Sequence, residues 1–180
     1  MQNFVVEPLA KDQIAAAFPL IREAMPSLDI KSWTRLARDL TDPRRSRQRG
    51  ILAARRHQRR HASGLLYYRK EHDLERGAIL IADHYVAIDL LDARPVVAAL
   101  ITALERLAVE LHCSAVRSVL HASSADIASE LYSAGHYLEG ATLCKPVSPQ
   151  SVPAHEGPLF PILIGEDSGE GHCDQACSTR

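Results

Sequence analysis

Hydrophobic and polar positions in the first 25 residues follow two different patterns. Phe4 to Val6 is a short apolar run that stops at Pro8, which is typical of a short strand. The apolar residues that follow recur at helical spacing and predict a helix: Ile14, Phe18, Ile21 and Met25. Pro19 falls inside this helix, so we expect it to kink or split the helix.

A second helix is predicted before residue 43. Ser27 and Asp29 are candidate N-caps, because their side-chain oxygens can accept from the first free N–H groups of a helix. Thr41-Asp42-Pro43 should end the helix. Its predicted apolar face comprises Ile30, Trp33, Leu36, Ala37 and Leu40.

The pattern then changes to that of strands. Gly50 to Ala54 and Ser63 to Tyr68 predict a hairpin with a basic tip, Arg55 to His61. Ala78 to Leu91 is mostly apolar, as expected of a strand that is buried on both faces. It is long for one strand, and the polar pair Asp83-His84 near its middle predicts a bulge or bend.

The last part of the pattern predicts helix, strand, helix and strand. The strongest amphipathic helix has the apolar face Val96, Val97, Leu100, Ile101, Leu104, Leu107, Ala108 and Leu111. Ala115 to Leu120 is the next candidate strand, and Ser123 or Ser124 should cap a short helix. Gly135 is placed to end that helix, and His136 to Val147 has strand character. The residues expected to face inward on the short helix are Ile127, Ala128, Leu131 and Tyr132.

Composition indicates a soluble globular protein. The chain has 180 residues, 46% of them hydrophobic, which fits one folded domain and excludes disorder throughout. We place this domain at residues 1–147 and an acidic extension containing Pro and Gly, largely irregular, at 148–180. No apolar run approaches the roughly 20 residues of a membrane span. The N-terminus lacks a signal-peptide pattern, so we expect a cytoplasmic protein.

Two clusters of residues are candidate binding sites that the overall charge of −1 does not reveal. Eight arginines lie between Arg44 and Arg60, where they could contact phosphates or an acidic ligand, or form a solvated tip that the acidic extension neutralises. The second interpretation is favoured, so we expect no nucleic-acid partner. His172, Cys173 and Cys177 lie close together near the end, but a structural zinc normally needs four ligands, so we expect no metal.

From Ala78 onward the order of elements resembles the core of the GNAT acyltransferase superfamily. The resemblance implies an α/β (α+β) fold in which a mixed, mostly antiparallel sheet is flanked by helices, in the order β-α-α-β-β-β-α-β-α-β. The earlier helix pair and hairpin also match the order of elements in that family, so the resemblance spans roughly residues 3–147. The segments that carry it are Val86-Ala-Ile-Asp89, Leu100 to Ala108, Leu131 to Tyr137 and Cys144-Lys145-Pro146.

In that family the turn before the amphipathic helix binds the pyrophosphate of acetyl-CoA and usually reads Arg/Gln-x-x-Gly-x-Gly/Ala. Here Asp92 to Ala99 can be aligned in two registers. One places Asp92 at the basic position and Pro95 and Val97 at the glycines; the preferred one starts at Arg94 and places Val97 and Ala99 there. Neither register recovers the motif. Pro95 lacks an N–H, and a branched residue replaces glycine, so the loop is degenerate.

The resemblance nevertheless assigns acetyl-CoA as cosubstrate to the strand end and helix start. The predicted cofactor-binding residues are Ile88, Asp89, Leu90, Arg94, Val96, Val97, Ala98 and Ala99.

Candidate acid and base residues lie on the short helix and the long strand. The family often has a Tyr four residues before the helix-ending Gly, to protonate the leaving thiolate. Here that position is Leu131, and Tyr132 is the nearest candidate; a packed Tyr is the alternative. Imidazole has the intrinsic pKa best suited to proton transfer near neutrality, so His84 is the preferred general base, with Asp83 beside it. The alternative, that both are only polar residues of a strand bend, is favoured over a catalytic role.

These observations lead to two functional hypotheses. The first is an acetyl-CoA-dependent N-acyltransferase that acts on a primary amine, without metal or covalent intermediate. The second is a catalytically inactive GNAT-like binding or regulatory module whose basic hairpin meets a partner or a nucleic acid. The first is favoured. We expect a small-molecule or peptide amine as acceptor and no membrane partner, and a homodimer stays open.

Overall fold

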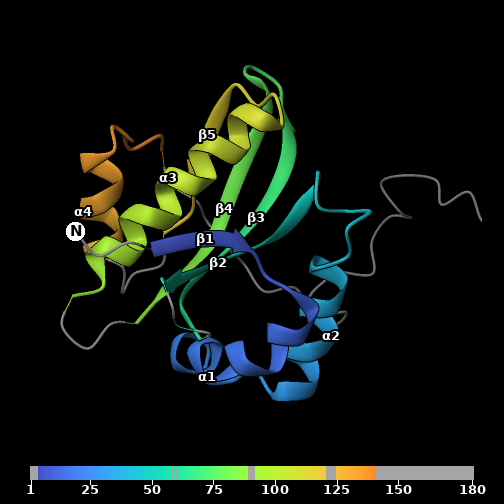
Figure 1. Cartoon of the computed structure of the whole chain (residues 1–180). Helices are drawn as coiled ribbons and strands as arrows, with labels where there is room; N and C mark the ends of the chain where they lie inside the picture. Colours follow the sequence, from blue (N-terminus) through green and yellow to red (C-terminus); the bar gives the residue numbers. More distant parts are fainter. Residues whose placement is uncertain (1–3, 58, 60, 89–91, 121–124, 141–180) are drawn as a thin grey trace, which may run out of the picture. The chain divides into compact units, whose positions relative to one another are not determined.

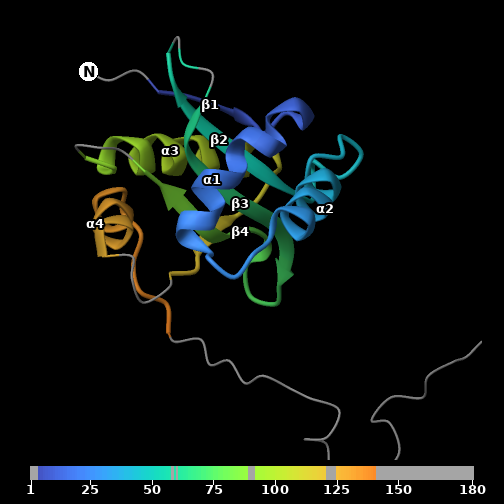
Figure 2. The same ribbon diagram turned by 90° about the horizontal axis from the view of Figure 1, so that it is seen from below.

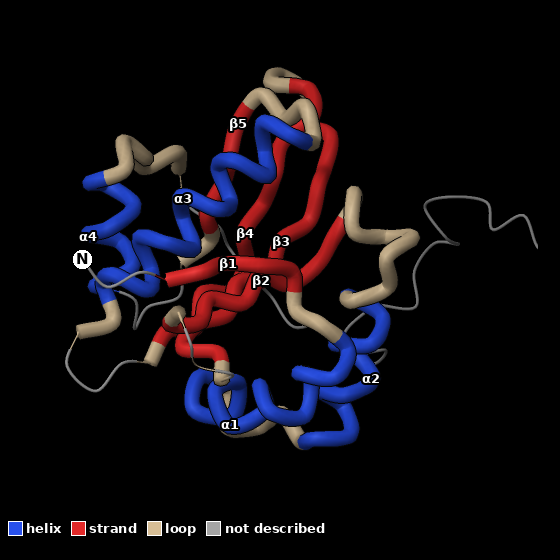
Figure 3. Tube along the Cα trace, in the orientation of Figure 1, coloured by secondary structure: helices blue, strands red, loops and turns tan. Residues whose placement is uncertain are grey.

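Five strands form one sheet whose order in space is their order along the chain (Figures 1 and 3). The computed structural model describes residues 4–140 except 58, 60, 89–91 and 121–124. The strands are β1 Phe4–Pro8, β2 Arg49–Arg56, β3 Ala62–Asp73, β4 Gly77–Ala87 and β5 Ala115–Ser118. The helices are η1 Lys11–Gln13, α1 Ile14–Ala24, α2 Ile30–Leu40, α3 Arg94–Glu110 and α4 Ala125–Ser133.

The sheet is antiparallel from β1 to β4 and parallel between β4 and β5. The parallel pair needs a crossover connection, which α3 provides. The predicted fold class and the predicted order of elements as far as α4 are therefore confirmed. The last predicted strand is wrong over residues 136–140, which form no strand, and its remainder lies outside the described residues.

Helices cover both faces of the sheet (Figure 2): α1 and α2 lie on one face and α3 on the other, with α4 beside α3. The alternation of side chains along β2 divides the core accordingly. Ile51 and Ala53 pack against α1 and α2, whereas Leu52 and Ala54 pack against α3. The sheet is thus buried from both sides, as the apolar sequence of its central strands predicts.

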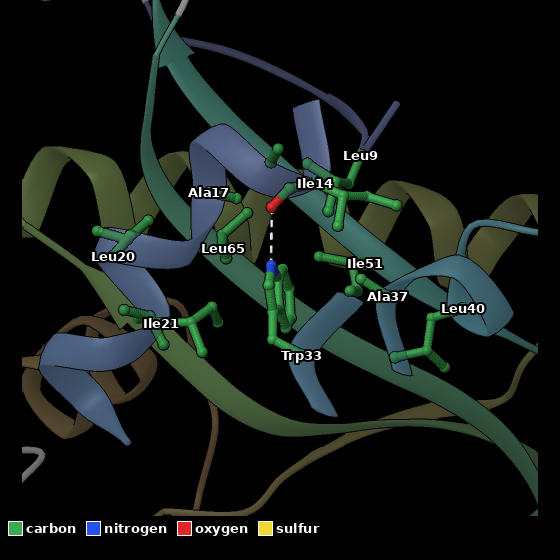
Figure 4. Packing of buried hydrophobic residues seen from close by; sticks show 12 residues of the cluster. Leu9, Ile14, Ala17, Leu20, Ile21, Trp33, Ala37, Leu40, Ile51 and Leu65 are labelled. Atoms are coloured by element: carbon green, nitrogen blue, oxygen red, sulfur yellow. Dashed lines mark hydrogen bonds between the residues drawn. The ribbon is translucent and has the colours of Figure 1, made fainter. Parts of the chain in front are cut away.

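Trp33 lies at the centre of the α1/α2 side (Figure 4). Its indole Nε1–H donates to the carbonyl of Ile14 at 2.7 Å, so α2 is joined to the start of α1 by a buried hydrogen bond. Asp29 caps α2 as predicted, because its carboxylate accepts from the backbone N–H groups of Lys31 and Ser32.

Pro19 does not split α1, which runs from Ile14 to Ala24, so this part of the prediction is wrong. A proline removes the hydrogen bond to the carbonyl four residues earlier, which here belongs to Ala15. Both residues are exposed, so water can satisfy that carbonyl. Among the described residues, no helix has the length and apolar character needed to cross a membrane.

Candidate active site

The parallel pair β4/β5 separates halfway along β4. The two strands pair only from Ile79 with Ala115 to Ala82 with Ser118, and the N–H of Val119 makes the last bond, to Ala82 O, at 2.8 Å. β4 continues to Ala87, and over this part β3 is its only partner among the described strands. The carboxyl end of β4 therefore has an edge that no described strand covers.

Backbone groups of β4 face this edge in a fixed alternation. Ile88 donates its N–H to Ser63 O at 2.9 Å, so its backbone faces β3. In an antiparallel ladder every second residue directs both N–H and C=O to the same side. Tyr85 and Ala87 therefore direct theirs toward the uncovered edge, where an amide-bearing ligand can pair as an added strand.

Tyr85 also bridges the two strands at the point where they separate. Its hydroxyl lies 2.7 Å from Ser118 Oγ, and its ring packs against Val97 and Ile101 of α3. Burial of the phenol raises the pKa of Tyr85 to about 12, although the bond to Ser118 opposes the shift. Tyr85 is thus a neutral hydrogen-bonding group at neutral pH.

The bulge predicted at Asp83-His84 is present and turns both residues to the α1/α2 face. The register shifts between Tyr67 and Tyr68, so that Tyr67 lies opposite His84 and Tyr68 opposite Ala82. The Asp83 carboxylate accepts from Arg69 Nε at 2.6 Å, and this bond raises the pKa of Arg69. Asp83, one of the predicted catalytic residues, is thus held in an ion pair.

A groove of about 510 Å³ lies beside this bulge on the same face of the sheet. Burial, together with the nearby Asp83 carboxylate, raises the pKa of the Tyr67 phenol, while Arg69 and Arg49 oppose the shift. The groove therefore places a phenol among several charges next to His84. Its lining residues are Arg45, Gln48, Arg49, Tyr67, Arg69, Lys70 and Glu71.

Backbone N–H groups in the first turn of α3 already have partners within the chain. Arg94 donates its N–H to Asp92 Oδ1 at 3.0 Å, and Val96 donates to Ala93 O at 3.0 Å. Pro95 occupies the first turn, as predicted, and has no N–H. The Arg94 guanidinium is paired with Asp92, which lowers the pKa of that carboxyl. This helix start is therefore not an open anion cradle.

No protein-family model matches the chain, and no curated protein sequence does. Solved structures match it over most of its length. An aminoglycoside N-acetyltransferase in complex with CoA has a TM-score of 0.67 at 12% identity, covering 83% of this chain and 97% of that chain. Glucosamine-6-phosphate N-acetyltransferase from Arabidopsis thaliana has a TM-score of 0.66 at 10% identity, covering 82% of this chain and 100% of that chain.

Ribosomal-protein-alanine N-acetyltransferase from Brucella melitensis biovar Abortus 2308 has a TM-score of 0.65 at 14% identity, covering 81% of this chain and 100% of that chain. The chain has the GNAT fold. At these identities the likeness concerns architecture, so the resemblance found in the sequence is confirmed at the level of the fold.

The predicted cofactor-binding residues differ in their exposure within the GNAT fold. Ile88 is exposed at the end of β4, whereas Asp89 and Leu90 lie outside the described residues. Val96 and Val97 are fully buried, so only their backbone could meet a ligand. Arg94 is exposed at the start of α3, and Ala98 and Ala99 are partly buried.

Tyr132 does not face inward, and this part of the prediction is wrong. Its side chain is 58% exposed, while Leu131 beside it packs against Val97 and Ile101. The end of α4 has the predicted left-handed glycine: Gly135 has φ +89°, and the His136 N–H donates to Leu131 O. Tyr132 lies on the α3 side of the sheet and Asp83 and His84 on the other, and its catalytic role stays a prediction.

Sequence reasoning missed several groups around the bulge in this GNAT fold. Tyr67, Arg69 and Arg49 come from two hairpin strands whose register determines which residues meet, and the sequence does not fix that register. Tyr85 is hidden within an apolar run. In the part of the chain that the structure describes, no cluster of His, Cys, Asp and Glu side chains is suited to hold a metal ion. His172, Cys173 and Cys177 lie outside that part.

Proposed function

We propose that the protein is an N-acyltransferase that moves an acetyl group from acetyl-CoA to a primary amine. The observation that carries the proposal is the separation of β4 from β5 after Ala82, next to a bulge that presents Asp83 and His84. Its support is the GNAT fold, shared with solved acetyltransferases, one of them in complex with CoA.

The residues at this edge fit one part of acetyl-CoA better than the other. The N–H and C=O groups of Tyr85 and Ala87 suit the amides of the pantetheine arm. The first turn of α3 suits the diphosphate less well, because its N–H groups are bonded and Asp92 contributes a negative charge. Within the described part of this turn Arg94 supplies a cation, but its guanidinium is paired with Asp92.

Acetyl-CoA supplies the activated acyl group as a thioester. On the protein side, the N–H groups at the β4 edge are donors for negative charge that develops on a carbonyl oxygen. His84 is the proposed general base for the acceptor ammonium, since imidazole exchanges protons near neutral pH. Asp83 contributes charge near the acceptor. Tyr132 is the proposed proton donor to the leaving thiolate.

The inactive binding module remains the second candidate, because the α3 start is already satisfied by its own chain. Cofactor binding separates the two functions. An enzyme of this kind must bind acetyl-CoA, whereas a binding module need not.

The test is calorimetric titration of the full chain with acetyl-CoA, with desulfo-CoA as the control for reaction. We expect a dissociation constant in the micromolar range. Ala87→Pro removes an N–H that faces away from β3, so it should weaken binding at least tenfold without opening the sheet. Ala87→Ser keeps that N–H and is the matched control. Absence of heat at near-millimolar ligand, with protein shown to be folded, would refute the acyltransferase function.

A further inference from the structure

One end of the groove carries more positive than negative charge. Arg45 Nη1 lies 2.5 Å from Asp39 Oδ1, and Arg49 Nη2 lies 2.8 Å from Asp39 Oδ2. A single carboxylate thus pairs with two guanidinium groups. The side chains of Arg45 and Arg49 are 48% and 37% exposed. The surplus is one positive charge, on planar groups that bind carboxylate and phosphate in a bidentate manner.

The opposite end carries the reverse surplus. Arg69 pairs with Asp83 and also with Glu71, so two carboxylates share one guanidinium. Asp83 is at the bulge of β4, next to the candidate base His84. The ion pairs of this end leave one excess negative charge, and Lys70, the other cation of the groove lining, donates its ammonium to Leu111 O at 2.6 Å. This end therefore suits a protonated amine.

The two ends are close neighbours on the sheet. Arg49 and Arg69 lie directly opposite each other in the β2/β3 ladder, where like charges are unfavourable unless anions accompany them. Tyr67 lies within electrostatic reach of both ends, since Asp83, Arg69, Arg49 and Asp39 all act on its phenol. A ligand of a few bonds' length can therefore contact both.

We infer that the acceptor is a primary amine that also carries an anionic group, held with its ammonium toward Asp83 and Glu71 and its anion toward Arg45 and Arg49. The inference rests on the proposed function, which it deepens by naming the substrate class. A plain alkylamine makes the contacts of one end only. The difference in affinity between an anionic amine and a plain alkylamine therefore sets the specificity.

The test compares matched probes for binding to the full chain without any CoA ligand, at constant ionic strength, by calorimetry. 6-Aminohexanoate is paired with hexylamine, and O-phosphoethanolamine with ethanolamine, so that the two arms distinguish a carboxylate from a phosphate. In at least one arm the anionic amine should bind at least tenfold more tightly than its partner. Thiol release from acetyl-CoA then measures the same preference in kcat/KM.

Arg49→Gln should abolish this preference by weakening only the anionic amine, and Arg45→Gln, at a more exposed position, should reduce it without disturbing the fold. Arg106→Gln, on the exposed side of α3 across the sheet, is the control that keeps it. Equal binding of both members of both pairs, or a preference that survives Arg45→Gln and Arg49→Gln in folded protein, would overturn the inference. Failure of acetyl-CoA to bind would instead refute the proposed function, because the amine titrations contain no CoA.

Discussion

Trp33 is the only tryptophan of the chain and is 2% exposed, so its hydrogen bond to Ile14 O is shielded from water. Trp33→Phe keeps an aromatic ring but removes the donor. We expect the free energy of unfolding to fall by about 1–3 kcal/mol, the range for a buried hydrogen bond lost with one partner left behind. Urea unfolding followed by circular dichroism measures it. A loss below about 0.5 kcal/mol, the level of an ordinary surface change, would contradict the packing.

Tyr85 predicts a pH dependence of stability. Its pKa is raised from 10.0 to about 12 in the folded protein, so the neutral phenol is favoured by folding. The unfolded chain loses this proton first as pH rises above 10. The contribution is therefore complete below pH 10 and lost between about pH 10 and 12, in total about 3 kcal/mol at 1.36 kcal/mol per pKa unit.

Tyr85→Phe removes this titration, so its free energy of unfolding should fall less than that of the wild type between pH 9 and pH 11. Ser118→Ala removes the hydrogen-bond partner but keeps the phenol, and it should retain the alkaline loss. Parallel urea titrations at both pH values measure the difference. Identical pH profiles for wild type and Tyr85→Phe would contradict the assigned burial of the phenol.

Single residues could be predicted where local chemistry decides their role. Asp29 caps α2, and Gly135 adopts positive φ, because these roles depend on neighbours in sequence. The bulge was predictable because Asp83 and His84 interrupt an apolar run. The outward direction of Tyr132 was not predictable. One residue on a helix is about 100° of rotation, and the packing of Leu131 on α3 leaves Tyr132 facing solvent.

At the scale of elements, Gly64 allows α3 to lie directly on β3. A Cβ at this position would be 2.5 Å from Val96 Cγ1 and 3.2 Å from the carbonyl oxygen of Val86. Val96 is fully buried and β-branched, so it cannot turn aside easily. Gly64→Ala should therefore destabilise the protein by about 1–3 kcal/mol through overpacking. Urea unfolding measures this loss, with Ser63→Ala as the control. Equal stabilities of Gly64→Ala and the wild type would contradict the close approach.

The start of α3 gives the next prediction. Asp92 pairs with Arg94 beside a helix N-terminus where acetyl-CoA is proposed to place its diphosphate. Asp92→Asn removes a competing charge and leaves the guanidinium available, so the dissociation constant of acetyl-CoA should fall by about two- to fivefold. Calorimetry measures the change, and Asp12→Asn on η1 is the charge-matched control. Unchanged or weaker binding by Asp92→Asn would show that Asp92 does not compete there.

The extents of the elements were less predictable than their order. β3 continues to Asp73 through a polar sequence, because pairing with β4 rather than burial extends it. The position of Arg49 opposite Arg69 depends on the hairpin register. The groove therefore could not be assembled from sequence, although its arginines stood out as a basic stretch.

At the scale of the whole folded unit, the sheet separates two apolar clusters that must unfold together if the protein is one cooperative unit. Ile21 belongs to the α1/α2 side, and Ile101 packs with Val97 and Leu131 on the α3 side. Ile→Val at either position should cost about 0.5–1.5 kcal/mol. Because the sheet lies between them and they share no partner, the two losses should add to within about 0.5 kcal/mol in the double variant.

Urea unfolding of the four proteins, followed by circular dichroism, measures both the losses and the slope of free energy against urea. A constant slope with additive losses means that both faces are lost in one transition. A reduced slope, or a double variant that loses much less than the sum, would mean that the α1/α2 side can open while α3 stays on the sheet. The groove is formed by β2 and β3 on the α1/α2 side and the β4 edge is supported by α3, so such partial opening would remove the groove first and leave the β4 edge in place.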